Sequence, residues 1–171
     1  DYTTGTVDAG TITSASGTLA NLLTAYGSNG ITGLGNETIS VSDTGVGSSL
    51  DASDLNSLDS KTSGSVTTAA GLETLTGSVS ALNTAYGSGG LTIDGDEAIT
   101  ITGSAVTVAA ADLNLLNSYT SGSINADNVA KLTGSVADLN TAFGAKAASG
   151  SNGINFGGSA GAADQAVEIT D

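Results

Sequence analysis

The residues with the clearest capacity for chemistry are three carboxylates in one short turn. Asp94, Asp96 and Glu97 lie between two segments that alternate apolar and polar residues, as β-strands do. Carboxylate oxygens are preferred ligands of Ca²⁺, which accepts roughly six to eight oxygens. The turn is therefore a candidate calcium site, and calcium is the candidate cofactor. The alternative is a solvated acidic turn, because the equivalent turn Leu34–Glu37 carries fewer charges.

The sequence shows no pattern that is typical of catalysis. A serine nucleophile needs a neighbouring base, and the chain has no histidine. A pair of carboxylates can hydrolyse a glycoside, but Asp54 and Asp112 recur at equivalent positions, which indicates helix capping rather than a unique pair. The sequence therefore predicts a protein that is not an enzyme.

Three aromatic residues occupy equivalent positions along the chain: Tyr26, Tyr86 and Phe143. An exposed row of this kind could stack on sugar rings, whereas a buried row would close the end of a helix against its neighbour. Phe replaces Tyr once, so the hydroxyl is not required and the buried interpretation is favoured. A second equivalent position holds Tyr2, Lys61 and Tyr119, and the lysine indicates that this position is exposed.

The charge balance excludes several kinds of partner. The 171 residues include 17 Asp and Glu but only 3 Lys and Arg, which gives a formal net charge of −14. Nucleic-acid binding needs clustered cations that neutralise phosphates, and anionic membranes repel an acidic surface. No apolar run is long enough to insert into a membrane, and the absence of cysteine excludes disulfides and thiolate metal sites.

The segments that must position these residues recur three times. Three phrases carry the repeat, namely Thr62–Val66, Leu75–Val79 and Leu82–Gly87, which return as Thr120–Ile124, Leu132–Val136 and Leu139–Gly144. A steady period of about 58–60 residues is typical of stacked repeat proteins. The chain is therefore interpreted as one array of three repeats, residues 1–60, 61–118 and 119–171, with an insertion at 145–163 in the third.

Each repeat alternates short helices and short strands. The patterns predict helices over 51–59, 78–86, 109–117 and 135–143, and strands over 37–42, 64–67, 97–102, 122–125 and 166–170. Ser135 and Asp138 resemble a capping box, and Gly87 and Gly144 lie where a helix end favours a left-handed residue. The Gly- and Ala-rich insertion is expected to form a loop over one face or edge.

These patterns predict a mainly β fold. We expect a solenoid like a parallel β-helix or β-roll, with short helical turns, in which each turn of the chain adds a strand to a continuous sheet. The expected inward residues are Val66, Leu75, Val79, Leu82 and Ile99. An array of three helices per repeat is the weaker alternative, because Ser, Thr and Gly oppose long helices.

Several phrases together resemble a known kind of segment. They are Ala-Asp-Leu-Asn around Asp112 and Asp138, Leu82–Gly87, and Gly-Leu-Gly-Asn-Glu ending at Glu37, besides the Ser/Gly phrases above. In these residues the chain resembles the tandem repeats of very large bacterial cell-surface and secreted proteins, notably those of cyanobacteria. The resemblance covers residues 1–144 and the closing strand. It implies an extracellular or cell-surface structural role and supplies no catalytic residues.

The sequence-based expectation of function is a structural one. We expect a non-enzymatic stalk, surface filament or matrix element that stacks end to end, with a second copy or adjoining repeats as its partner. We expect both ends to be cut within the repeat, since Asp1–Thr3 matches Ser60–Thr62 and Glu168–Asp171 matches the strand that ends at Asp43. The alternative is an adhesin or phage-fibre module that binds glycans through the 145–163 loop or the aromatic row.

Overall fold

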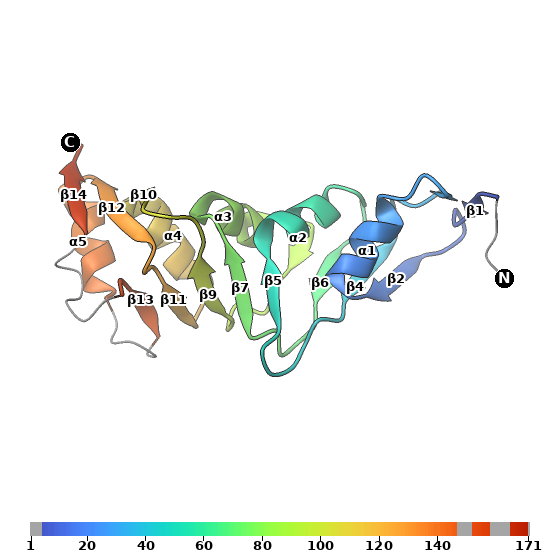
Figure 1. Cartoon of the computed structure of the whole chain (residues 1–171), viewed down its shortest axis with the longest axis horizontal. Helices are drawn as coiled ribbons and strands as arrows, with labels where there is room; N and C mark the ends of the chain where they lie inside the picture. Colours follow the sequence, from blue (N-terminus) through green and yellow to red (C-terminus); the bar gives the residue numbers. More distant parts are fainter. Residues whose placement is uncertain (1–4, 147–151, 158–164, 171) are drawn as a thin grey trace.

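The computed structural model describes residues 5–146, 152–157 and 165–170. The molecule is elongated, with its helices in a row along the length, its strands beside them and its termini at opposite ends (Figure 1). The helices are α1 Leu19–Tyr26, α2 Ala52–Asp59, α3 Val79–Gly87, α4 Ala110–Tyr119 and α5 Val136–Gly144. The strands are β1 Val7–Asp8, β2 Ser14–Gly17, β3 Ile31–Thr32, β4 Thr38–Val41, β5 Ser49–Asp51, β6 Val66–Thr68, β7 Thr74–Gly77, β8 Leu91–Thr92, β9 Ala98–Ile101, β10 Val106–Ala109, β11 Ser123–Asn125, β12 Val129–Gly134, β13 Gly153–Asn155 and β14 Ala166–Ile169.

The fold is α/β, so the prediction of a mainly β solenoid is wrong. Helices take 29% of the residues and strands 32%. Neighbouring helices pack side by side along the molecule, α1 on α2 through to α4 on α5. Helices of two turns are unstable alone, but this lateral packing stabilises them. The prediction took the Ser, Thr and Gly content as evidence against long helices. Several of these residues instead lie at helix ends and turns rather than inside helices.

The strands form parallel sheets whose neighbours lie about one turn of the chain apart. The described sheets have the orders β1-β3, β2-β4-β6-β8, β5-β7-β9-β11-β13 and β10-β12-β14. Every strand pairing among them is parallel. In the five-stranded sheet, Leu50, Leu75, Ile99, Ile124 and Ile154 occupy matching positions on successive strands.

Three kinds of strand can be distinguished by their place in the chain. A leading strand runs directly into a helix (β2, β5, β7, β10 and β12), and a trailing strand follows a helix (β3, β6, β8, β11 and β13). A bridging strand lies between a trailing and a leading strand (β4 and β9). Two end strands are classed by their pairing: β1 pairs with β3 as β6 pairs with β8, so it is trailing. β14 pairs with β12 as β9 pairs with β7, so it is bridging.

The five-stranded sheet contains the full set: two leading strands, one bridging strand and two trailing strands. The sheets nearer the ends of the molecule contain only parts of this set. Successive strands of the chain lie in different sheets, and the strand after each bridging strand is the first of a new sheet, β5 after β4 and β10 after β9. The first and second repeats therefore each contribute strands to three sheets, and the described part of the third repeat contributes strands to two.

The core is a continuous row of aliphatic side chains between the helices and the sheets. The expected inward residues Val66, Leu75, Val79, Leu82 and Ile99 are all buried, which confirms that prediction. Burying a side chain of this size contributes about 1.5–3 kcal/mol relative to exposing it. Since each turn of the chain adds only a few such side chains, stability depends on contact between successive turns.

The helix ends differ in part from the expectation. Ser135 caps α5 by accepting a hydrogen bond from the Asp138 amide at 3.1 Å, and its hydroxyl donates to the Asp138 carboxylate at 2.8 Å. This is a variant of the predicted capping box. Gly87 and Gly144 close their helices without the left-handed conformation expected of them. Each glycine is the last residue of its helix, and the chain leaves the helix at the following residue without a left-handed turn.

The insertion 145–163 lies partly outside the described residues. Within the described part, Gly153–Asn155 forms β13, which pairs with β11 at the edge of the five-stranded sheet. Ile154 and Phe156 are buried. The prediction of a surface loop is therefore wrong for this segment, since its apolar residues belong to the core.

Candidate functional site

Two tyrosine–glutamate pairs, each with a half-buried tyrosine and a buried glutamate, lie at equivalent places in the first two repeats. The Tyr26 hydroxyl donates to Oε2 of Glu37 at 2.8 Å, and the Tyr86 hydroxyl donates to Oε2 of Glu97 at 3.1 Å. The same oxygens accept the backbone N–H of Gly35 at 2.8 Å and of Gly95 at 3.0 Å. Both glutamates are fully buried. Each pair therefore ties the end of a helix to the turn before a bridging strand.

The surroundings shift the pKa values of Tyr26, Glu37 and Tyr86. Burial acts to raise the pKa of the Glu37 carboxyl, but hydrogen bonds from Gly35, Tyr26 and nearby backbone N–H groups outweigh it and hold the pKa below the ordinary value. Burial, together with the hydrogen bond to Glu37 and its negative charge, raises the pKa of Tyr26. The pKa of Tyr86 is raised by burial, by the charge of Glu97 and by the hydrogen bond to it. The Tyr26–Glu37 pair therefore consists of a charged acceptor and a neutral donor at neutral pH.

The third repeat replaces both members of the pair. Phe143 stands where the first two repeats have tyrosine, and Gln165 stands where they have glutamate. Gln165 donates its side-chain amide to the Phe156 carbonyl at 3.2 Å, and the Phe143 ring lies 5.6 Å from the Phe156 ring. The hydroxyl and the carboxylate are lost together, which indicates that each serves the other. This joint replacement was the sequence signal for the pair, and the sequence reasoning missed it.

The threonine of the repeated Thr-Ser-Gly phrase donates a hydrogen bond to the backbone carbonyl of the same glutamate in the preceding turn of the chain. We call this contact the threonine clamp. Thr62 donates its hydroxyl to the Glu37 carbonyl at 2.7 Å, and Thr120 donates to the Glu97 carbonyl at 2.9 Å. A Cβ atom at Gly64 would overlap the Glu37 carbonyl oxygen. Only glycine allows this close approach, so the recurrence of the phrase has a structural cause.

The three residues of the candidate calcium site point in different directions. Glu97 is buried and bonded to Tyr86 and Gly95, whereas Asp94 and Asp96 are exposed. Across the residues that the structure covers, no three acidic side chains gather in a way that could hold a metal ion. A structural role for the Glu97 carboxylate is therefore evident, and calcium binding stays a prediction from the sequence.

The aromatic row faces inward. Tyr26, Tyr86 and Phe143 are half-buried and pack against the core. Tyr119 is also half-buried, and its ring stacks on Tyr86 with centroids 5.6 Å apart and planes 10° apart, whereas Lys61 at the equivalent position is exposed. The row packs against the core, as the buried interpretation predicted, and glycan binding through the row stays a prediction from the sequence.

An asparagine ladder connects the helices. The side-chain amides of Asn56, Asn83 and Asn114 each donate at 3.0 Å to a carbonyl in the first turn of the next helix. The acceptors are the backbone oxygens of Ala81, Asp112 and Asp138. Asn140 holds the equivalent position in α5 and is exposed. The repeated Leu-Asn dipeptide thus supplies one core leucine and one link between neighbouring helices.

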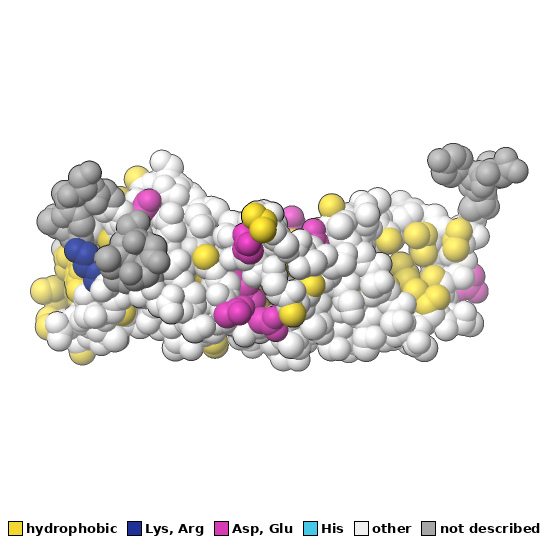
Figure 2. All heavy atoms as spheres, turned by 90° about the horizontal axis from the view of Figure 1, so that it is seen from below, with side chains coloured by type: hydrophobic (Ala, Val, Ile, Leu, Met, Phe, Trp, Pro, Cys, Tyr) yellow, Lys and Arg dark blue, Asp and Glu magenta, His cyan; other side chains and the backbone are white. Residues whose placement is uncertain are grey.

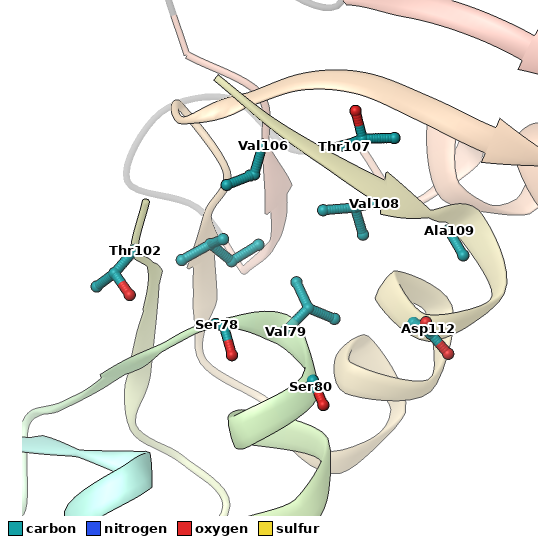
Figure 3. A pocket seen from close by; sticks show the side chains of 10 residues that line it. Ser78, Val79, Ser80, Thr102, Val106, Thr107, Val108, Ala109 and Asp112 are labelled. Carbon is teal, nitrogen blue, oxygen red and sulfur yellow. The ribbon is translucent and has the colours of Figure 1, made fainter. Parts of the chain in front are cut away.

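A pocket of about 240 Å³ lies where β9 and β10 separate into different sheets. Figure 3 shows Val79, Val106 and Val108 around it, with Ser78 and Asp112 at the starts of α3 and α4. The Ser78 hydroxyl is occupied as a helix cap, since it accepts the Ala81 amide at 3.1 Å. The lining is apolar side chains, hydroxyls and one carboxylate. We interpret the pocket as a consequence of the change of sheet.

The two ends of the molecule expose apolar residues whose equivalents are buried in the middle. Val167 and Ile169 of β14 are 50% and 60% exposed, whereas Ile99 and Ile101 of β9 are both 1% exposed. At the other end Val7 is 46% exposed. Figure 2 shows hydrophobic side chains gathered towards both ends and acidic side chains gathered near the middle. The ends are therefore the surfaces that lack the neighbour found elsewhere in the molecule.

A groove of about 400 Å³ lies beside α1 and β2 at the N-terminal end, and its lining is mainly apolar. Ala15, Leu22 and Ile31 are among the residues that line it. Inside the molecule the equivalent space beside β7 and α3 is filled by the preceding leading strand and its helix, β5 and α2. The groove thus has the position of one strand–helix unit.

No described helix has the length and apolar character needed to cross a membrane. Comparison of the chain with protein-family models, with curated proteins and with solved structures finds no match.

Proposed function

We propose that this chain is a non-enzymatic structural repeat unit that stacks end to end, either with further copies or with adjoining repeats. The single observation that carries the proposal is the contrast in burial between the ends and the middle. β14 and β9 are equivalent strands, yet the apolar residues of β14 are half exposed or more while those of β9 are buried.

The internal hydrogen bonds support a structural role. Each tyrosine–glutamate pair, threonine clamp and asparagine link joins parts of the chain that belong to the same or successive turns. All three kinds of contact recur along the stack. Recurrent links of this kind are what a stacked array needs, because its stability comes from nearest-neighbour contacts. An extracellular or cell-surface location stays a prediction from the sequence resemblance.

The test is sedimentation velocity of the purified chain over a wide range of concentration, in low and high salt. We expect the mean sedimentation coefficient to increase with concentration, and more so in high salt, because the net charge of −14 opposes association. The variant Val167→Asp should reduce association. The matched control is Leu115→Asp, since Leu115 is 44% exposed but lies on the helix α4 and not on an end strand. A chain that stays monomeric throughout would contradict the proposal, and so would equal effects of the two variants.

A further inference from the structure

The end sheets of the molecule are complementary parts of one complete sheet. At the C-terminal end, β10-β12-β14 consists of two leading strands and a bridging strand. At the N-terminal end, β1-β3 consists of two trailing strands. Together they contain the set found in the five-stranded sheet β5-β7-β9-β11-β13, in the same order.

We propose that β14 of one copy pairs in parallel with β1 of the next copy, so that the two incomplete sheets join into one five-stranded sheet. This inference rests on the proposed function and specifies its contact. The partner is a second copy of this chain, because the interior of the molecule already shows a bridging strand paired with a trailing strand. That pairing occurs twice, as β4 with β6 and as β9 with β11.

The interior pairings also give the register of the contact. Ile39 lies opposite Val66, and Ile99 lies opposite Ile124. Val167 is the equivalent of Ile39 and Ile99, since it pairs with Leu132 as Ile99 pairs with Leu75. Val7 is the equivalent of Val66, since it pairs with Ile31 as Val66 pairs with Leu91. Val167 is therefore expected opposite Val7 of the next copy.

The backbone of β14 is oriented for this pairing. In a parallel strand, successive N–H groups point to opposite sides. The Thr170 amide donates to Gly134 of β12 at 3.1 Å, as the Ser42 amide donates to Gly17 at 2.9 Å. The Ile39 amide points the other way and donates to Ser65 at 2.8 Å. By this equivalence the Val167 and Ile169 amides point to the open edge, where β1 of the next copy would accept them.

One side-chain pair makes the contact between copies weaker than the interior ones. On the outer face the interior register places Ser40 opposite Thr67, so both residues are uncharged. The same register places Glu168 opposite Asp8 of the next copy. Like charges directly opposite each other on paired strands are destabilising. The ion pair of Glu168 with Lys131 is exposed and offsets this repulsion only in part.

Hydrogen exchange of single amides tests this pairing. The protein is measured at low and at high concentration, under conditions where sedimentation shows monomers and assemblies. We expect exchange at Val167 and Ile169 to slow by at least about tenfold on assembly, and exchange at Thr170 to stay slow in both states. Assembly without protection at Val167 and Ile169 would overturn this strand pairing and leave the proposed function standing. Absence of assembly would overturn both.

A charge variant tests the register. Asp8→Asn removes the repulsion but keeps the side-chain oxygen that accepts the Gly10 amide at 2.9 Å. We expect it to strengthen association about 1.5- to 5-fold at low salt, with a smaller gain at high salt. Asp94→Asn is the matched control, since Asp94 is exposed, lies in the middle of the chain and changes the net charge equally. Equal effects of the two variants would overturn the predicted register.

Discussion

At the scale of single residues, the most specific interaction is the hydrogen bond that a half-buried tyrosine donates to a buried glutamate. A hydrogen bond to a charged group contributes about 1.5–3 kcal/mol, and a buried carboxylate left with one partner fewer is costly. The third repeat avoids this cost by replacing both residues. Removing one member should therefore be worse than removing both in the way that Phe143 and Gln165 do.

A double-mutant cycle on Tyr26 and Glu37 measures this coupling. We expect Tyr26→Phe to lower the free energy of unfolding by about 1.5–3 kcal/mol, because Glu37 loses its hydroxyl donor. In the Glu37→Gln background the same change should cost clearly less. The measurement is chemical denaturation of the four proteins. Additive effects would show that the hydroxyl and the carboxylate act independently, contrary to the structure.

The pKa of Glu37 predicts the response to acid. Its folded-state pKa lies below the ordinary value of 4.5, so its carboxylate contributes stability that is present above about pH 4.5 and is lost as the pH falls through the folded-state pKa. We expect the melting temperature to fall below pH 4.5, and to fall less in Glu37→Gln than in the parent chain. Asp94→Asn serves as the control with an equal change of charge. An unchanged acid response in Glu37→Gln would contradict the shift.

At the scale of elements, the sequence predicted positions better than architecture. The helices expected over 78–86 and 135–143 are α3 and α5 within a residue, because apolar spacing and a preceding serine mark them. The leading strands were missed, since Thr74–Gly77 is short and ends in glycine. The predicted fold class was wrong because the packing of helices on one another cannot be read from local sequence patterns. That information lies in contacts between residues about 25 positions apart, such as Asn56 with Ala81.

The candidate site was predicted only in part for a similar reason. The exposed positions Asp94 and Asp96 were recognisable as an acidic turn. The inward direction of Glu97 was not, because it depends on Tyr86 reaching across from α3. Comparing the repeats with each other would have linked the two residues, since both change in the third repeat.

The asparagine ladder gives a test at the scale of helices. Asn114→Ala removes the link from α4 to the Asp138 carbonyl of α5. We expect it to lower the free energy of unfolding by about 1 kcal/mol, the usual contribution of one hydrogen bond. Asn140→Ala is the matched control, because Asn140 holds the same position in α5 and is exposed. The melting temperatures of the two variants show whether the hydrogen bond of Asn114 contributes to stability. Equal losses would show that the asparagines act through helix propensity alone.

At the scale of the whole molecule, the incomplete sheets and the apolar groove describe the same missing neighbour. The sheet β2-β4-β6-β8 has one leading strand instead of two, and the groove lies beside that strand and α1. One strand–helix unit would complete both. The β5–α2 unit, residues 49–59, has the right character, since Leu55 and Leu58 are fully buried in its own place in the stack.

An extended chain tests this interpretation. Residues 44–59 follow Asp43 in the first repeat, and Asp171 is the equivalent of Asp43. Appending a copy of residues 44–59 after Asp171 should supply a leading strand for β2 of the next copy and a helix for its groove. We expect the extended chain to associate at lower concentration than the parent chain in sedimentation experiments. An extension with the same residues in scrambled order is the control, and equal association of the two would contradict the assignment of the groove.

The most direct test of end-to-end stacking is electron microscopy of the purified chain in negative stain, over increasing concentration and at high salt. Parallel strand pairing between ends does not close on itself, so it should produce unbranched rods that lengthen with concentration. The rods should have a uniform width, because each copy adds along the long axis seen in Figure 1. Compact single particles at millimolar concentration, or irregular aggregates without a common width, would contradict the account.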